Sequence, residues 1–256
     1  MTLAAFQRAI CDLIASPELC LSLRADPEAA LARYELSARE RKRLSEVVWQ
    51  RGMSTNCTLY RSNRVTPIYT LLNYTCRALG DEFALVIDRF WNAQEYQDRQ
   101  FQSEVERFGA FLRRQIAAGV IASPFAGELL EFELATNALE FSPRKETLRD
   151  IAELAPPGLD TPCRLHPLAR VVRFRHEPGA LLRALAAGAV PASLSPGEWL
   201  VVLSAVDGEF QILQLPDGMP IRFDGAVASL IEPVTPRLAP ALAKAGLLVR
   251  LEDRAA

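Results

Sequence analysis

The fold of this chain is decided by the stretch Arg51-Gly-Met-Ser-Thr-Asn-Cys-Thr-Leu-Tyr-Arg-Ser-Asn-Arg-Val-Thr-Pro67 and by its continuation to Trp91. In its second half, apolar residues recur at steps of three and four, the spacing of one helical stripe: Val65, Ile68, Tyr69, Leu72, Cys76 and Leu79. Gly80 is expected to end this helix, and Asp81 to cap a second helix whose stripe is Phe83, Val86, Ile87, Phe90 and Trp91. The spacing therefore predicts a helical hairpin with a large aromatic interior.

Polar side chains crowd just before this hairpin, at Asn56, Thr58, Tyr60, Arg61, Asn63 and Arg64. Arginine forks match carboxylates, and asparagine amides match peptide groups, so this polar cluster is a candidate for binding a peptide or a partner protein. The alternative interpretation is structural. In that case the same residues cap Thr66-Pro67 and pair with a Glu-rich helix at 128–140.

Composition limits the classes of protein that this chain can belong to. Half of the 256 residues are apolar, and 29 basic and 31 acidic side chains give a net charge of −2. Such a balance provides no general attraction to nucleic acid or to anionic membranes. The sequence has neither the apolar core of a signal peptide nor a run of roughly 18 apolar residues, so we expect a cytoplasmic protein.

The five cysteines are expected to be reduced thiols, because their number is odd and no CxxC pair occurs. Cys11 and Cys76 fall on apolar helical stripes, as small core residues do. Cys57 lies inside the polar cluster and is the thiol to test for reactivity. Burial without reactivity is the alternative for Cys57 as well, since no histidine lies near it in sequence.

Residues 1–150 are predicted to form an all-helical domain. Its helix starts are marked by Ser16-Pro17, Asp26-Pro27, the capping box Ser37–Glu40 and Ser123-Pro124. Prolines and a glycine then interrupt the helical pattern, which places a domain boundary at about 142–162. The chain is therefore assigned to the α+β class, with a second domain at 160–256.

That second domain is predicted to be a small α+β module of winged-helix character. Strands are expected at 169–175, 198–204, 209–215 and 247–251, and helices at 178–187, 220–232 and 236–245. Asp207-Gly208 predicts a hairpin turn, and the edge strand of this hairpin can accept an extended peptide. Alternation puts Arg173 and Arg175 on one strand face with Val171, where they meet an acidic partner or water.

Several kinds of catalytic site are missing from the sequence. It contains no GxSxG elbow and no glycine-rich phosphate loop, and the isolated Gly52 and Gly80 are better explained as helix breaks. Glu128 and Glu131 have the spacing of carboxylate metal bundles, but such sites need a Glu-x-x-His partner, and no histidine precedes His166. We therefore expect a binding protein with no catalytic residue, metal or cofactor of its own.

At Tyr60-Arg61-x-Asn63, followed by a helix and Leu79-Gly80-Asp81-Glu82-Phe83, the chain resembles the partner proteins of multinuclear non-heme iron-dependent oxidases. Phe108-x-x-Phe111-Leu112 and Glu128-Leu129-Leu130-Glu131-Phe132-Glu133 fit the same family. The segment Asn56-Cys57-Thr58-Leu59-Tyr60 looks closer to the TglI type, of thiaglutamate synthesis, than to the MbnC type, of methanobactin synthesis.

This resemblance implies an accessory subunit in the biosynthesis of ribosomally made, modified peptides. The subunit would form a heterodimer with an oxidase and present a precursor peptide to it. The oxidase would hold the iron ions and use dioxygen to modify a cysteine, which in the TglI type is at the peptide's C-terminus. Two other classes remain open: a winged-helix protein that binds nucleic acid or regulates, and a thiol enzyme built on Cys57.

Overall fold

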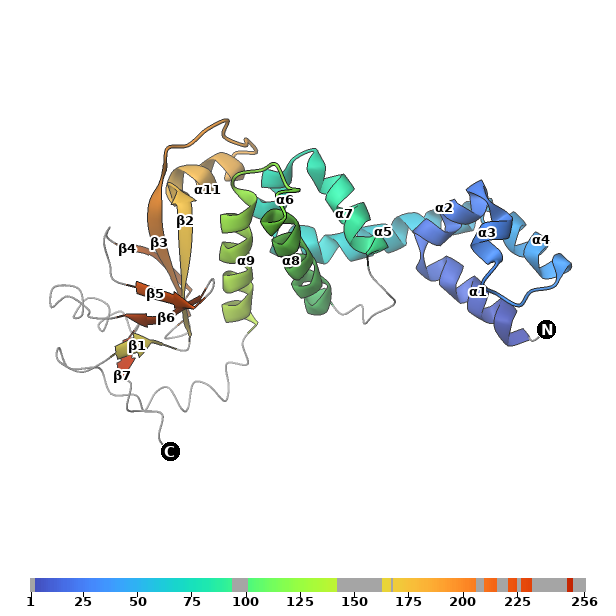
Figure 1. Ribbon diagram of the computed structural model, residues 1–256, viewed down its shortest axis with the longest axis horizontal. Helices are drawn as coiled ribbons and strands as arrows, with labels where there is room; N and C mark the ends of the chain where they lie inside the picture. Colours follow the sequence, from blue (N-terminus) through green and yellow to red (C-terminus); the bar gives the residue numbers. More distant parts are fainter. Residues whose placement is uncertain are drawn as a thin grey trace. The chain divides into compact units, whose positions relative to one another are not determined.

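The computed structural model describes residues 3–93, 101–141, 163–166, 168–205, 210–215, 221–224, 227–231 and 248–250. The helices in these ranges are α1 (Leu3–Ala15), α2 (Pro17–Ala25), α3 (Pro27–Leu31), α4 (Ala38–Val47), α5 (Arg51–Leu71), α6 (Asn73–Leu79), α7 (Glu82–Asn92), α8 (Phe101–Ala117), α9 (Ala126–Glu140) and α11 (Pro178–Ala186). The strands are β1 (Cys163–Leu165), β2 (Ala169–His176), β3 (Pro196–Ser204), β4 (Gln211–Leu215), β5 (Ile221–Asp224), β6 (Val227–Ile231) and β7 (Leu248–Arg250). The α+β class is confirmed, with helices in the majority (Figure 1).

The chain divides into two compact units. Unit 1 consists of Met1–Thr70 and Ala84–Phe108, and unit 2 of Leu71–Phe83 and Gly109–Ala256. This division differs from the sequence-based boundary at 142–162, which lies outside the described residues. The physical reason is that a sheet must bury one apolar face, and α9, which precedes that boundary, covers the face formed by β2 and β3.

The helix starts of unit 1 follow the sequence signals. The Ser16 hydroxyl accepts from the Leu19 N–H at 3.1 Å, and the Asp26 carboxylate accepts from the Ala29 N–H at 3.1 Å. Ser37 makes the predicted capping box with Glu40. These local caps confirm the predicted starts of α2, α3 and α4, which surround a core that includes Leu13, Leu23, Leu31, Leu44 and Val48.

Helix α5 corrects the prediction made for the polar cluster. The cluster does not precede a helix; it lies within one, because α5 runs without a break from Arg51 to Leu71. Gly52, predicted as a helix break, is the second residue of α5. Pro67 also lies inside this helix, where it removes one backbone donor and so leaves the carbonyl of the exposed Asn63 without its usual helical partner.

The single helix predicted from Val65 to Leu79 is in fact two helices. The break falls at Leu72, whose φ and ψ of −124° and 45° are not helical. Two side chains of α9 satisfy the backbone groups that this break exposes. The Asn137 amide donates to the Leu71 carbonyl at 3.0 Å, and the Glu133 carboxylate accepts from Tyr74 and Thr75 N–H at 2.6 and 2.9 Å. Helix α6 then ends at Gly80, where a φ of 52° suits glycine, as predicted.

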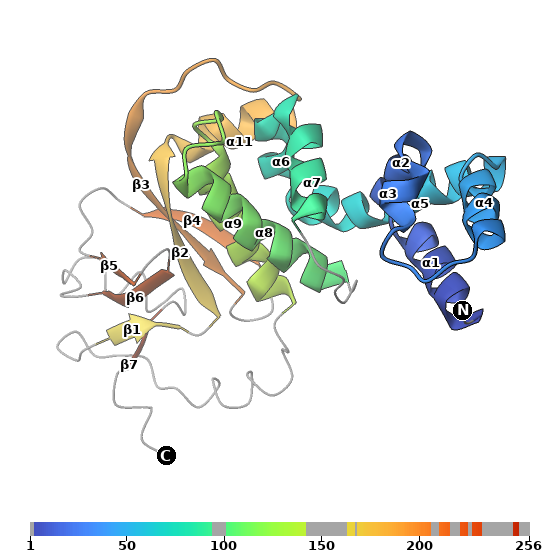
Figure 2. The same cartoon turned by 45° about the vertical axis from the view of Figure 1, so that its right-hand side comes forward.

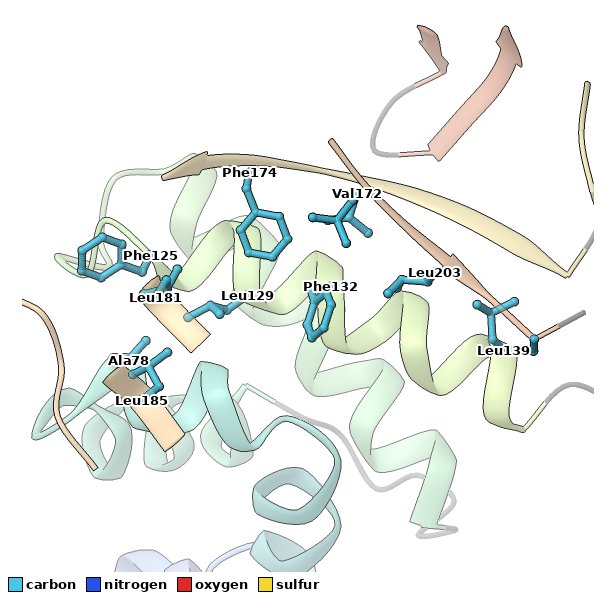
Figure 3. Packing of buried hydrophobic residues seen from close by; sticks show 12 residues of the cluster. Ala78, Phe125, Leu129, Phe132, Leu139, Val172, Phe174, Leu181, Leu185 and Leu203 are labelled. Atoms are coloured by element: carbon cyan, nitrogen blue, oxygen red, sulfur yellow. The ribbon is translucent and has the colours of Figure 1, made fainter. Parts of the chain in front are cut away.

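The main core of unit 2 lies between a three-stranded antiparallel sheet, in the order β2-β3-β4, and the helices α9 and α11. Figures 1 and 2 both show α9 running alongside β2 and β3. Val172 and Phe174 of β2 point toward Phe132 of α9, and the rings of Phe132 and Phe174 meet edge to face at 5.7 Å (Figure 3). Complete burial of such a side chain contributes about 1.5–3 kcal/mol.

The second half of strand β3, from Leu200 to Ser204, is buried on both faces. Val201 and Leu203 belong to the core shared with α9, while Leu200 and Val202 are buried on the opposite face. Strand β3 pairs with β2 through Val172↔Val201 and with β4 through Leu203↔Ile212. The predicted pairing of the strands at 198–204 and 209–215 is therefore confirmed by β3 and β4, although the turn Asp207-Gly208 lies outside the described residues.

A second antiparallel sheet has the order β5-β6-β1-β7. It shows that the helix predicted at 220–232 is wrong, because β5 and β6 occupy this segment and pair with each other. Pairing of β6 with β1, which is distant in sequence, adds main-chain hydrogen bonds that a local pattern does not reveal. The strand predicted at 247–251 is confirmed as β7, and the helix predicted at 236–245 lies outside the described residues.

In the ranges described, none of the helices combines the length and the apolar character needed to cross a membrane.

Candidate functional site

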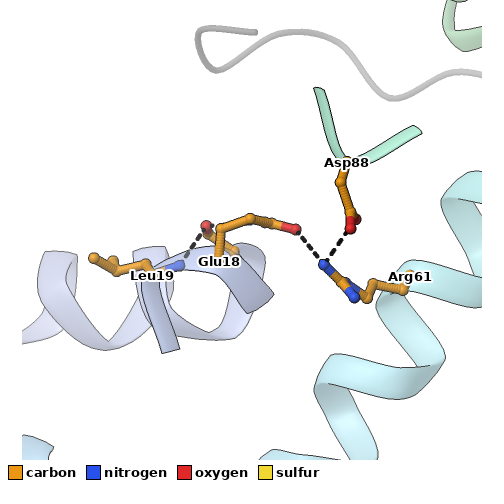
Figure 4. A network of polar contacts seen from close by, with 5 residues as sticks. Glu18, Leu19, Arg61 and Asp88 are labelled. Atoms are coloured by element: carbon orange, nitrogen blue, oxygen red, sulfur yellow. Dashed lines mark hydrogen bonds and ion pairs between the residues drawn. The ribbon is translucent and has the colours of Figure 1, made fainter. Parts of the chain in front are cut away.

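The arginines of the polar cluster are engaged within unit 1. Figure 4 shows the Arg61 guanidinium between two carboxylates. Its Nη2 atom lies 3.2 Å from Glu18 Oε1 of α2 and 3.1 Å from Asp88 Oδ1 of α7. The guanidinium also lies over the ring of Trp91, 5.6 Å from its centroid. Arg61 therefore holds α2, α5 and α7 together through partly exposed charge pairs.

Arg64 makes a more deeply buried pair with Glu104 of α8. The Nε and Nη2 atoms of Arg64 lie 2.9 and 2.7 Å from Glu104 Oε1, and Arg107 Nη2 lies 2.8 Å from Glu104 Oε2. The Glu104 side chain is only 3% exposed, so two guanidiniums compensate a carboxylate removed from water. The carboxylates engaged by Arg61 and Arg64 come from α2, α7 and α8, whereas the sequence predicted the Glu-rich helix at 128–140.

The other members of the cluster have separate surroundings along α5. The Asn56 amide donates to the Ile14 carbonyl at 2.9 Å. Tyr60 is half-buried, and its ring centroid lies 5.8 Å from Arg64 Cζ. Cys57 is half-buried and packs against the N-terminal core. Asn63 is exposed. The geometry favours the structural interpretation for Arg61 and Arg64, and it leaves Thr58 and Asn63 as the members that face solvent.

The arginines of β2 alternate with buried residues, as predicted for a strand. Arg173 and Arg175 are exposed, whereas Val171 on the same face is buried. Arg173 Nε pairs with Glu198 Oε1 of β3 at 3.0 Å, a cross-strand contact. Arg170 is half-buried, and its burial lowers the pKa of its guanidinium. Strand β2 therefore presents the positive charge of Arg175 to solvent, whereas the charge of Arg173 is paired with Glu198.

Strand β4 offers an open edge among the described strands of unit 2. It lies at the end of the sheet order β2-β3-β4, and none of the described strands pairs with its outer edge. The opposite edge strand, β2, contacts β6. Two large apolar side chains of β4 are exposed, Ile212 at 52% and Leu213 at 39%. An edge strand with unpaired backbone groups and exposed apolar side chains is a surface to which another extended chain can add.

One pair of ionisable groups was missed by the sequence analysis. His176 Nδ1 lies 2.9 Å from Glu128 Oε1, and the Arg175 N–H donates to Glu128 Oε2 at 2.5 Å. The sequence analysis found no histidine near Glu128 along the chain. The fold nevertheless brings β2, which contains His176, against α9, which contains Glu128. In the ranges described, no three or more His, Cys, Asp or Glu side chains are grouped so that they could hold a metal ion.

Glu133 is a buried carboxylate of unit 2. Burial raises the pKa of Glu133 to about 7, and the hydrogen bonds from Thr75 and Tyr74 oppose this shift. The carboxylate caps the first turn of α6, so its buried position has a structural explanation. No sequence signal identified this cap, because 58 positions separate Thr75 from Glu133.

A polar hollow in unit 1 was also not predicted. Its lining includes Arg8, Asp12, Arg33, Tyr34 and Glu35. The Tyr34 hydroxyl donates to Asp12 Oδ2 at 2.6 Å and accepts from Arg33 at 2.6 Å. Burial, followed by the bond to Asp12, raises the pKa of Tyr34. The Tyr34 hydroxyl therefore links Asp12 of α1 to Arg33, which follows α3.

Comparisons with known proteins add no family to this description, because no protein-family model and no curated protein matches the sequence.

Proposed function

We propose that this chain is a peptide-binding accessory subunit, which presents a ribosomally made precursor peptide to a multinuclear non-heme iron-dependent oxidase. The observation that carries the proposal is the open edge of β4, with exposed Ile212 and Leu213. The proposal also rests on the sequence resemblance at Tyr60-Arg61-x-Asn63 and Leu79–Phe83 to the partner proteins of such oxidases.

The edge of β4 suits an extended peptide better than a folded ligand. A peptide that adds as a strand gains main-chain hydrogen bonds whatever its sequence, and alternate side chains give the selectivity. Ile212 is directly opposite Leu203 and Leu213 opposite Val202, so an added strand would meet an apolar side chain on each face of the sheet. In this proposal the C-terminal part acts as a peptide-recognition module of winged-helix character.

The chemistry would belong to the partner. The oxidase would hold the iron ions and modify a cysteine of the peptide, at its C-terminus if the TglI type applies, and the present chain would contribute position only. Asn63, Arg173 and Arg175 are the exposed side chains from the predicted set, and in this proposal they contact a partner protein or peptide, although Arg173 also pairs with Glu198. We place this complex in the cytoplasm.

The proposal is tested with a multinuclear non-heme iron-dependent oxidase and a cysteine-bearing precursor peptide of the proposed class. A fluorescent form of that peptide is titrated into the wild type, Ile212→Lys and the matched control Val190→Lys, which alters an exposed apolar residue away from the sheet. We expect Ile212→Lys alone to weaken binding tenfold or more, because a charge at an edge opposes strand addition.

Co-purification tests the second half of the proposal. We expect a stable heterodimer with the oxidase, and loss of peptide modification when this chain is omitted. An oxidase that is not retained and whose turnover is unchanged without this chain would refute the proposal. DNA binding at micromolar protein that falls with salt would instead support the nucleic-acid-binding alternative.

A further inference from the structure

Two cysteines of unit 1 share one region of its core. Cys20 of α2 is 2% exposed, and Cys57 of α5 packs against the same cluster of buried residues while remaining partly exposed. Cys57 is one of the neighbours whose interaction with Cys20 raises the pKa of the Cys20 thiol. The two cysteines are 37 positions apart in sequence, so this proximity is a product of the tertiary structure and has no CxxC signature.

Contacts made by the residues before and after Cys57 hold α5 against α1 and α2. One residue before Cys57, the Asn56 amide donates to the Ile14 carbonyl at 2.9 Å. One turn after Cys57, Arg61 pairs with Glu18 at 3.2 Å. Residues 57 and 61 are four apart and therefore lie on the same face of α5. Because Arg61 on this face contacts Glu18 of α2, the Cys57 side chain also faces α2.

We propose that Cys20 and Cys57 form a reversible disulfide by exchange with a small disulfide such as glutathione disulfide. Cys57 is the thiol that solvent reaches, so it reacts first. Its thiolate attacks one sulfur of glutathione disulfide, and a bond to Cys57 Sγ forms as the S–S bond of the reagent breaks. One glutathione thiolate leaves and takes up a proton.

Cys20 completes the reaction. It loses its proton to solvent and attacks Cys57 Sγ, which displaces the second glutathione. The protein loses two protons and two electrons, and one glutathione disulfide becomes two molecules of glutathione. Burial, followed by the neighbouring Cys57, raises the pKa of Cys20 to about 12, so Cys20 acts only as the resolving thiol of an adduct held next to it.

The test uses the intact chain with glutathione buffers of increasing oxidised fraction. Free thiols are then alkylated under denaturing conditions, and peptides are mapped by mass spectrometry. We expect one linked peptide pair that contains Cys20 and Cys57, two hydrogen atoms lighter than its parts and restored by dithiothreitol. The Cys11→Ser variant, which removes an exposed thiol, should form the same link.

Two further measurements separate this disulfide from simple surface oxidation. The Cys20→Ala variant should accumulate a glutathione adduct on Cys57, because the resolving thiol is gone. The oxidised wild type should melt roughly 5 °C or more above the reduced form, and Cys57→Ser should show no such difference. A stable adduct on Cys57 in the wild type, or a Cys20 that remains fully alkylated after oxidation, would overturn the proposal.

Discussion

Glu104 of unit 1 and Glu133 of unit 2 are both buried carboxylates, yet they are compensated in different ways. Glu104 accepts from two guanidiniums, those of Arg64 and Arg107. Glu133 accepts two backbone N–H groups at the first turn of α6. Arginine supplies a full charge that stays with the carboxylate at any ordinary pH, whereas amide dipoles supply only partial charge.

This difference shows which polar residues are available for function. A cluster rich in arginine and asparagine suggests an open binding site when only the sequence is known. In the structure, Arg61 and Arg64 are paired with carboxylates of the same unit. Strand β4 contains no charged residue, and none of the described strands pairs with its outer edge. Substitutions of buried charged residues and of exposed charged residues should therefore have different effects on stability.

The largest effect is expected for Arg64→Met. It leaves the buried Glu104 with one guanidinium in place of two, and loss of a partner from a buried ion pair costs about 3 kcal/mol. Urea unfolding followed by circular dichroism measures the loss. A free energy of unfolding within about 0.5 kcal/mol of the wild type would show that Arg107 alone suffices.

A comparable effect, dependent on pH, is expected from Glu133. Burial holds its pKa at about 7 in the folded chain, above the value of 4.5 for an unperturbed glutamate. Between these values the unfolded state loses its proton first, so stability falls as pH rises from about 4.5 to about 7. At about 1.4 kcal/mol per pKa unit, a difference of about 2.5 units gives a total of roughly 3–4 kcal/mol.

Glu133→Gln removes this titration and keeps an oxygen that accepts from the α6 backbone. The free energy of unfolding of this variant relative to the wild type should therefore rise between pH 5 and pH 7.5. Glu131→Gln is the matched control, because Glu131 is on the same helix but pairs with Arg113 at 2.6 Å. Equal pH profiles for Glu133→Gln and the wild type would contradict the assignment.

A smaller loss is expected for His176→Leu, which removes the imidazole from the buried Glu128. The carboxylate keeps the Arg175 N–H, so the loss should be about 2 kcal/mol. Arg175→Ala provides the control, because the backbone N–H, not the guanidinium, makes that contact. Thermal melts of the two variants should differ by several degrees, and equal melting temperatures would exclude a role for the histidine.

The smallest effect is expected for Arg61→Met. The Arg61 side chain is 38% exposed and its partners Glu18 and Asp88 are 26% and 49% exposed, so solvent screens both pairs. We expect a loss below about 1 kcal/mol, seen as a small shift of the urea midpoint that high salt reduces. If the same variant also released the oxidase in a pull-down, Arg61 would have a binding role besides its structural one.

Local signals in the sequence predicted a large part of this fold. Ser16, Asp26 and Ser37 start helices as predicted, because a cap needs only a side chain and the next three residues. Gly80 ends a helix for an equally local reason, its positive φ. The alternating pattern at 169–175 predicted β2, and the turn signal Asp207-Gly208 between two strand-like segments predicted β3 and β4. For the candidate site, the sequence predicted the hairpin that contains the β4 edge.

Contacts between distant segments decided the rest. The break at Leu72 depends on Glu133 and Asn137, and β6 is a strand because β1 pairs with it. The partners of Arg61 and Arg64, and the meeting of Cys20 with Cys57, arise in the same way. A sequence by itself determines what its neighbouring residues can satisfy locally. Only the tertiary structure decided which distant group satisfies a buried charge, an unpaired backbone donor or a thiol.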